Sequence, residues 1–190
     1  MLNLVLFGAP GAGKGTQADF LIEKFRLVHL STGDLLRTQI AAQTEQGLEA
    51  KSYIDKGFLV PDSIVIGMIK TKLKENILER GFIFDGFPRT VNQAIALDEL
   101  LGESNLSVRG MLYLCVGKDE LVSRLLNRGK TSGRPDDQDV SIIENRITIY
   151  NEKTAPLRDY YDAQNKYFKI DGTGTVEEIA QRLTDTVSKL

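Results

Sequence analysis

The chain has 190 residues, of which 42% are hydrophobic and 26% are charged, and its formal net charge is −2. This composition indicates one ordinary globular domain over residues 1–190, and the near-neutral charge excludes the general positive field of a nucleic-acid-binding protein. A single cysteine excludes an intrachain disulfide and a cysteine zinc cluster, and no apolar run approaches the length that spans a membrane. This cysteine, Cys115, and the only histidine, His29, lie in apolar runs, and we expect structural roles for both.

Short apolar runs alternate along the chain with segments whose apolar residues recur every three or four positions. The first run, at residues 2–7, has the pattern of a strand and lacks the flanking residues of a signal peptide, so we expect a cytoplasmic protein. The expected strands are residues 2–7, 27–30, 81–85, 110–116 and 166–170. The expected helices begin near Lys14 and continue at residues 62–78, 118–127, 140–150 and 176–187. This alternation predicts a three-layer α/β fold, in which a five-stranded parallel sheet has helices on both faces and binds ligands beyond the carboxyl ends of its strands.

A glycine-rich loop follows the first strand. Residues 8–16 read G-A-P-G-A-G-K-G-T, and the following helix adds its positive N-terminal end. Glycines let successive backbone N–H groups point inward, so the segment forms a P-loop that cradles a nucleoside triphosphate, with Lys14 reaching the outer phosphates. The alternative is a glycine-rich turn with a surface lysine. Gly15 stands where the usual pattern has a hydroxyl residue and Thr16 follows it, so we expect Mg²⁺ to be held mainly by phosphate oxygens and water.

Two stretches depart from the core pattern. Residues 31–60 are an insertion of two helices, which we expect to be split near residues 46–47. Residues 129–137 read G-K-T-S-G-R-P-D-D, bracketed by Gly129 and Gly133. They are too poor in apolar residues to pack, so they form either a mobile flap or a plain surface loop.

Arginines gather next to loops at the expected ligand end of the sheet. They are Arg37, Arg89, Arg124, Arg128, Arg134 and Arg146. One such arginine would indicate a solvated face, but six favour an anion site, because guanidinium groups match phosphate geometry. Since a triphosphate already occupies the glycine-rich loop, the other arginines indicate a second phosphorylated substrate. This favours phosphoryl transfer to an ionised phosphate oxygen, which needs no general base, over hydrolysis.

Five motifs together identify a family. They are G-A-P-G-A-G-K-G-T-Q at 8–17, S-T-G-D-L-L-R at 31–37, G-F-L-V-P-D at 57–62, D-G-F-P-R-T-V-N-Q at 85–93 and R-L-L-N-R-G-K-T-S-G-R-P-D-D at 124–137. Over essentially its whole length the chain resembles the adenylate kinases, the nucleoside monophosphate kinases of the P-loop class. The resemblance implies reversible phosphoryl transfer from Mg-ATP to AMP, giving two ADP. Nothing in the sequence demands more than a monomer, so we expect one. It also implies an AMP-binding segment at 31–60 and a short lid at 127–137.

The resemblance also implies an ATP site. Its phosphates would be wrapped by Gly11, Ala12, Gly13, Lys14, Gly15 and Thr16. Arg124 and Arg128 would clamp the phosphates of ATP and the transferring group, and Gly174 would let the backbone approach the ATP base. Asp85 would orient Mg²⁺ through water, and the alternative for this residue is a strand-end cap. The lid is short and has no cysteines, so no structural zinc is expected.

The residues implied to bind AMP come from three parts of the chain. They are Thr32, Arg37, Phe58, Leu59, Val60, Gly86, Phe87, Pro88, Arg89, Gln93, Arg134 and Arg146. Arg37 and Arg89 would hold the AMP phosphate, and Gln93 would read the adenine edge, because an amide can donate and accept there at once. Arg134 and Arg146 would close over the AMP phosphate and the transition state. The implied catalytic residues are Lys14, Arg89, Arg124, Arg128, Arg134 and Arg146.

Three other functions compete with this interpretation. UMP/CMP kinases have the same architecture, but Thr32, Thr90 and Gln93 favour AMP, because those kinases usually carry S-A-G-D and P-R-N where this chain has S-T-G-D and P-R-T. A non-catalytic nucleotide sensor would have lost a catalytic group, whereas Lys14 and all five of the implied catalytic arginines are present. A P-loop ATPase would need access for water, which a closing flap argues against.

Overall fold

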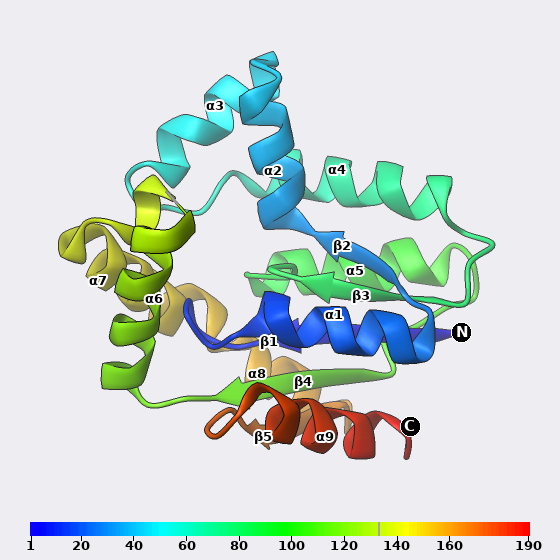
Figure 1. Cartoon of the computed structure of the whole chain (residues 1–190). Coiled ribbons are helices and arrows are strands. Elements are labelled where there is room, and N and C mark those ends of the chain that lie inside the picture. Colours follow the sequence, from blue (N-terminus) through cyan, green and yellow to red (C-terminus); the bar gives the residue numbers. More distant parts are fainter. Residues whose placement is uncertain (133) are drawn as a thin grey trace.

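The computed structural model describes residues 1–132 and 134–190 (Figure 1). Gly133, which we predict to bracket the polar stretch, lies outside the described residues. The strands are β1 (Leu2–Phe7), β2 (Val28–Ser31), β3 (Gly81–Asp85), β4 (Gly110–Cys115) and β5 (Tyr167–Asp171). Their order in the sheet is β2-β3-β1-β4-β5, and every neighbouring pair is parallel. Within the described residues, the predicted α/β class and five-stranded parallel sheet are therefore confirmed.

The central strand β1 is apolar on both faces because both faces are covered. Val5 and Phe7 belong to one core cluster, whereas Leu4 and Leu6 belong to another, as the alternation of a pleated strand requires. None of the four is more than 4% exposed. Full burial of side chains of this size contributes about 1.5–3 kcal/mol each, so β1 gives the loop that follows it a rigid base.

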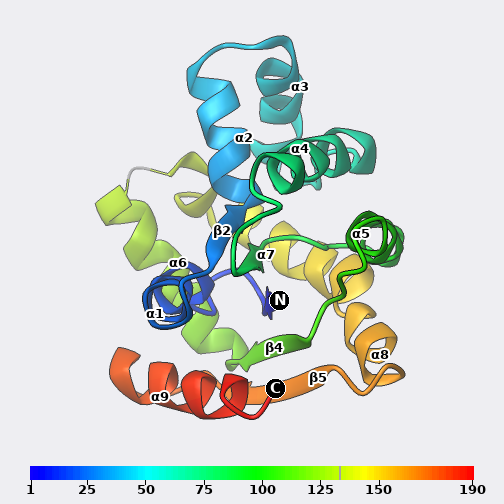
Figure 2. The ribbon, with the colours of Figure 1, turned by 90° about the vertical axis from the view of Figure 1, so that its right-hand side faces the viewer.

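Helices form the outer layers of the molecule. They are α1 (Lys14–Phe25), α2 (Thr32–Ala41), α3 (Glu45–Ile54), α4 (Asp62–Glu75), α5 (Val91–Gly102), α6 (Lys118–Ser132), α7 (Val140–Ile149), α8 (Leu157–Asp162) and α9 (Val176–Val187). Figure 2 shows α1 and α9 on one face of the sheet, with α4, α5 and α8 on the other. The α2–α3 and α6–α7 pairs stand beyond the carboxyl ends of the strands (Figure 1). None of the helices in the described residues is long and apolar enough to cross a membrane.

The two helices of the insertion divide earlier than the sequence suggests. The predicted break near residues 46–47 is wrong, because α2 ends at Ala41 and α3 has already begun at Glu45. The side chain of Thr44 caps α3 by accepting the backbone N–H of Gly47 at 3.0 Å. A Cβ on Gly47 would lie 2.2 Å from the backbone oxygen of Gln39. This glycine therefore permits close packing of α3 on α2 and does not interrupt the helix.

The helix that leads into the lid is longer than predicted. We expect it at 118–127, but α6 continues to Ser132, so the first part of the stretch predicted as a flap or loop is helical. The hydroxyls of Thr131 and Ser132 donate to the backbone oxygen of Arg128 at 3.2 and 2.8 Å. These bonds satisfy carbonyl groups that the end of a helix otherwise leaves without partners. After the undescribed Gly133, residues Pro135–Asp137 form one 3₁₀ turn.

Two helices on one face of the sheet are absent from the sequence prediction. The first, α5, begins after Thr90, whose side chain accepts the backbone N–H of Gln93 at 3.2 Å. A capping threonine followed by apolar residues at helical spacing is a usable signal for this helix. The second, α8, follows a π-helical turn at Tyr150–Thr154 and is too short to show a clear period.

Candidate functional site

A cleft of about 580 Å³ opens beyond the carboxyl ends of β1 and β3. Its walls come from the glycine-rich loop, the start of α2, residues 57–60, the loop after β3 and the arginines of α6 and α7. All of the predicted site residues line this cleft except Ala12, Phe87 and Gly174. The first two are each 1% exposed and pack in the core. Gly174 lines a separate hollow together with Arg124, which borders both spaces.

The glycine-rich loop wraps around Lys14 at the floor of the cleft. The ammonium Nζ of Lys14 donates to the backbone oxygens of Gly8 at 2.8 Å and Ala9 at 3.1 Å. Gly11 has a φ of +85°, and a Cβ on it would lie 2.8 Å from the backbone oxygen of Leu121. Glycine is therefore required where the loop turns toward the first residue of α1. The loop brings an ammonium group and a positive helix end together, which is an arrangement that binds phosphate.

Asp85 ends β3 directly beside this loop. Its Oδ2 lies 3.8 Å from Nε2 of His29, and a Cβ on Gly15 would lie 3.9 Å from the same oxygen. Burial disfavours ionisation of this carboxyl, but the neighbouring basic groups of His29, Lys14 and Arg89 outweigh it and hold the pKa of the carboxyl below its ordinary value. The cleft thus contains a carboxylate next to the loop position where the usual pattern has a hydroxyl.

Backbone carbonyls orient the side chains on the opposite wall. The backbone oxygen of Gly86 accepts Oγ1–H of Thr32 at 2.9 Å and Nε–H of Arg89 at 2.8 Å. Burial lowers the pKa of the Arg89 guanidinium, and the nearby Arg146 adds to this effect. Two basic groups held close together inside a cleft favour an anionic ligand between them.

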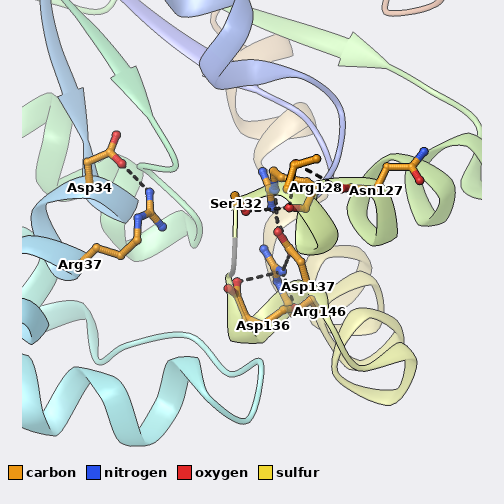
Figure 3. Close-up of polar contacts among 9 residues, drawn as sticks. Asp34, Arg37, Asn127, Arg128, Ser132, Asp136, Asp137 and Arg146 are labelled. Carbon is orange, nitrogen blue, oxygen red and sulfur yellow. Dashed lines mark hydrogen bonds and ion pairs between the residues drawn. The ribbon is translucent and has the colours of Figure 1, made fainter.

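Arg37 lies on the rim of this wall. Its Nη2 donates to Oδ1 of Asp34 at 2.5 Å, and the side chain is 42% exposed. In Figure 3 this pair lies apart from the arginines of α6 and α7, which line the same cleft. An exposed pair of this kind contributes little stability, so Arg37 can exchange its carboxylate partner for a ligand phosphate at small cost.

A buried carboxylate holds two of the arginines on the other side of the cleft (Figure 3). Asp137, whose side chain is 0% exposed, accepts Nε–H and Nη2–H of Arg128 at 2.6 and 3.0 Å. It also accepts Nη1–H of Arg146 at 2.6 Å. Burial disfavours ionisation of Asp137, but the two guanidinium groups outweigh it and lower its pKa. One carboxylate therefore links α6 to α7 and fixes two predicted phosphate-binding groups.

Sequence reasoning missed the side-chain partners of several site residues. Asp137 and Asp136 hold Arg146, His29 pairs with Asp85, and Asp62 contacts Gln93. Asp136 and Asp137 have a local signal, because two aspartates directly follow R-P in an arginine-rich stretch. The pairings of His29 and Asp62 have no local signal, because each joins residues far apart in the chain. In the described residues, no group of three or more His, Cys, Asp or Glu side chains could hold a metal ion.

Comparison with known proteins assigns the chain to a family. A model of the family described as adenylate kinase matches residues 6–166. The chain belongs to the adenylate kinase family. Among its curated relatives, the adenylate kinase of Flavobacterium psychrophilum is 52% identical over 190 residues, and that of Flavobacterium johnsoniae is 50% identical over the same length. The adenylate kinase of Parabacteroides distasonis is 48% identical. Each alignment covers 100% of both chains, so the predicted resemblance to the adenylate kinases is confirmed along the whole sequence.

Proposed function

We propose that this member of the adenylate kinase family transfers the γ-phosphoryl group of Mg-ATP reversibly to AMP, giving two ADP. The observation that carries this proposal is that one cleft contains both the phosphate loop and a second group of arginines. An enzyme that only hydrolysed ATP would not need the second anion site. The full-length relatives that bear the name adenylate kinase support the same activity.

ATP would occupy the side of the cleft formed by the glycine-rich loop. Backbone N–H groups of residues 11–16 would surround its phosphates, and Lys14 would follow the group that moves. Arg124 and Arg128 would clamp the phosphates, and the hollow at Gly174 would receive the base. This orientation is supported by Arg124, which borders both the cleft and the hollow.

AMP would occupy the opposite side, between the insertion and the loop after β3. Arg37 and Arg89 would hold its phosphate, while Thr32 and the backbone at 58–60 and 86–88 would line its nucleoside pocket. Gln93, which is 2% exposed and lines the cleft, would read the adenine edge. Residues 31–60 then act as the AMP-binding segment and residues 127–137 as a short lid, within one domain of a monomeric, cytoplasmic protein.

The chemistry needs charge neutralisation and positioning more than acid–base catalysis. The bond from the γ-phosphorus to the bridging oxygen of ATP breaks, and a bond to an ionised phosphate oxygen of AMP forms, so no proton has to move. Lys14, Arg89, Arg124, Arg128, Arg134 and Arg146 are the groups we propose to stabilise the charge on the transferring phosphoryl group. Arg134 and Arg146 would complete the set when the lid closes and excludes water.

The residues at the cleft floor fit a magnesium ion that enters with ATP. Asp85 is an ionised carboxylate beside Gly15, where it could accept hydrogen bonds from metal-bound water. Mg²⁺ in this place would neutralise charge on the phosphate oxygens. The protein itself would supply the carboxylate that orients the ion, Asp85, and the lysine that stabilises the moving group, Lys14.

The proposal is tested by following ATP that is labelled in its γ-phosphoryl group. With AMP present, we expect the label to appear in ADP, with two ADP formed for each AMP consumed. Without AMP, we expect the label to remain in ATP. Label released as inorganic phosphate at the same rate with and without AMP would identify an ATPase and contradict the proposal.

Replacing Gln93 by alanine should weaken AMP binding selectively. The amide would no longer donate to and accept from the adenine edge, so we expect KM for AMP to rise about tenfold or more, because unpaired polar groups at a base edge are costly. KM for ATP should change little. Steady-state kinetics with each substrate varied in turn checks this result, and equal increases in both KM values would remove Gln93 from the base-reading role.

The activity should depend on the charge of Lys14. Burial lowers the pKa of Lys14 to about 8, an effect that Asp85 opposes and that Arg89 and Arg146 reinforce. A triphosphate favours the protonated form, so we expect kcat/KM for ATP to fall as the pH rises through about 8, and kcat to fall only at higher pH. Lys14→Arg, which stays protonated, should lose this decline. The pH profiles of both parameters test the prediction, and a decline that persists in Lys14→Arg would contradict it.

A further inference from the structure

A carboxylate outside the cleft fixes the side chain that we propose to read the base. Asp62, the first residue of α4, accepts Nε2–H of Gln93 at 2.6 Å through its Oδ1. Its other oxygen, Oδ2, accepts Oγ1–H of Thr90 at 2.9 Å. Gln93 lines the cleft, whereas Asp62 is not among the residues lining it. Any influence of Asp62 on a ligand in the cleft therefore passes through Gln93.

The contacts of Gln93 define which end of its amide is oxygen. A carboxylate only accepts hydrogen bonds, so it selects the NH₂ end of the amide, and a backbone N–H only donates, so it selects the oxygen end. Asp62 faces Nε2, and the backbone N–H of Arg89 donates to Oε1 at 2.7 Å. Both neighbours select the same orientation. Each end retains one further bonding position, a second N–H and a second lone pair, for a ligand.

This fixed orientation matters because two related bases present opposite patterns. At the edge formed by its 6-amino group and ring nitrogen N1, adenine offers a donor and an acceptor. These match the oxygen and the NH₂ of the amide. At the same edge, hypoxanthine has an acceptor at its 6-oxo group and a donor at N1, so it matches only the flipped amide. An amide free to flip would accept both bases, whereas an amide held in one state accepts adenine and leaves hypoxanthine with mismatched groups.

We propose that Asp62 is a positioning residue that sets the amide orientation of Gln93 and so makes the monophosphate site selective for the 6-aminopurine over the 6-oxopurine. The inference rests on the proposed function, because it takes AMP to be the acceptor. It assigns a role in base selection to a residue that does not touch the base. Thr90 supports this arrangement by holding the second oxygen of Asp62 while it caps α5.

The test compares AMP with IMP, which differs from AMP at this edge of the base. In Asp62→Ala the NH₂ end of Gln93 loses its acceptor, so we expect the ratio of kcat/KM for AMP to that for IMP to fall about tenfold or more, with KM for ATP unchanged. Asp62→Asn retains a carbonyl oxygen that can accept from Gln93, and should keep most of the ratio. Glu177→Ala removes an exposed first-turn carboxylate from α9 and should leave the ratio unchanged.

A double-mutant cycle separates positioning from a general effect on structure. If Asp62 acts through Gln93, adding Asp62→Ala to Gln93→Ala should not change the AMP/IMP ratio further. A further fall in that background, or an unchanged ratio in Asp62→Ala alone, would overturn the proposal. Should Asp62→Ala fail to fold, Asp62→Ser, whose shorter side chain does not reach Gln93, is judged by the same ratio. A wild-type protein that forms no ADP from AMP would instead refute the proposed function.

Discussion

Lys14→Met should abolish phosphoryl transfer while the protein keeps its fold. Methionine has a similar length and no charge, so the change removes the ammonium group that donates to Gly8 and Ala9 and that we place beside the moving phosphoryl group. Removing one preorganised donor from such a site costs about 10²–10³-fold in kcat, and we expect a loss at the upper end of that range. Stability should change little, because a buried charge is removed together with its hydrogen bonds.

The measurement is the steady-state rate of ADP formation from ATP and AMP, with circular dichroism during thermal unfolding to confirm the fold. Lys24→Met provides a matched control, because Lys24 lies exposed in the last turn of the same helix, and it should keep wild-type activity. If Lys14→Met retained most of its activity, the glycine-rich loop would not be the phosphate cradle that we describe.

Asp137→Ala should loosen the lid and lower activity together. Asp137 is fully buried and holds Arg128 and Arg146, so its removal leaves two neighbouring guanidinium groups without their shared carboxylate. Breaking a buried ion pair by removing one partner costs about 3–5 kcal/mol. We expect a loss of stability at the lower end of this range, because the side chain of Arg128 is 37% exposed and can recover some solvation. Misplacement of both arginines should lower kcat about 10²-fold.

Hydrogen exchange of α6 and α7 measures the local effect, since these helices can open without global unfolding. Protection should fall there and remain unchanged in β1 and β3. Glu144→Ala removes an exposed carboxylate from α7 and should change neither protection nor rate. Wild-type exchange together with wild-type kcat in Asp137→Ala would show that this carboxylate does not organise the lid.

The sequence predicts most of the sheet and of the cleft because their signals are local. The strands are recognised as apolar runs bounded by polar loops, and the observed ends differ from the predicted ones by a single residue at most. The glycine-rich loop is recognisable because a phosphate cradle, a lysine and a helix start must follow one another directly. The six arginines could be grouped because parallel topology brings the ends of all strands to one edge.

The sequence could not predict features that depend on distant partners. The extent of α6 was underestimated because its last turn, which ends at Ser132, has no apolar residues that would show a helical period. The break in the insertion was misplaced because Gly47 serves close packing against Gln39, which the sequence does not distinguish from a helix break. The contact of Asp62 with Gln93 crosses 31 positions, and it exists only once α4 and α5 pack side by side.

The most direct test of the account is ADP formation from Mg-ATP with AMP, CMP, UMP or GMP as acceptor, together with a control without acceptor. We expect ADP to form efficiently with AMP and at background rates with the other three. A preference for CMP or UMP would leave the fold and the transfer chemistry in place but contradict the roles given to Thr32 and Gln93. Equal ADP formation without any acceptor would contradict the central claim that the cleft joins two nucleotides.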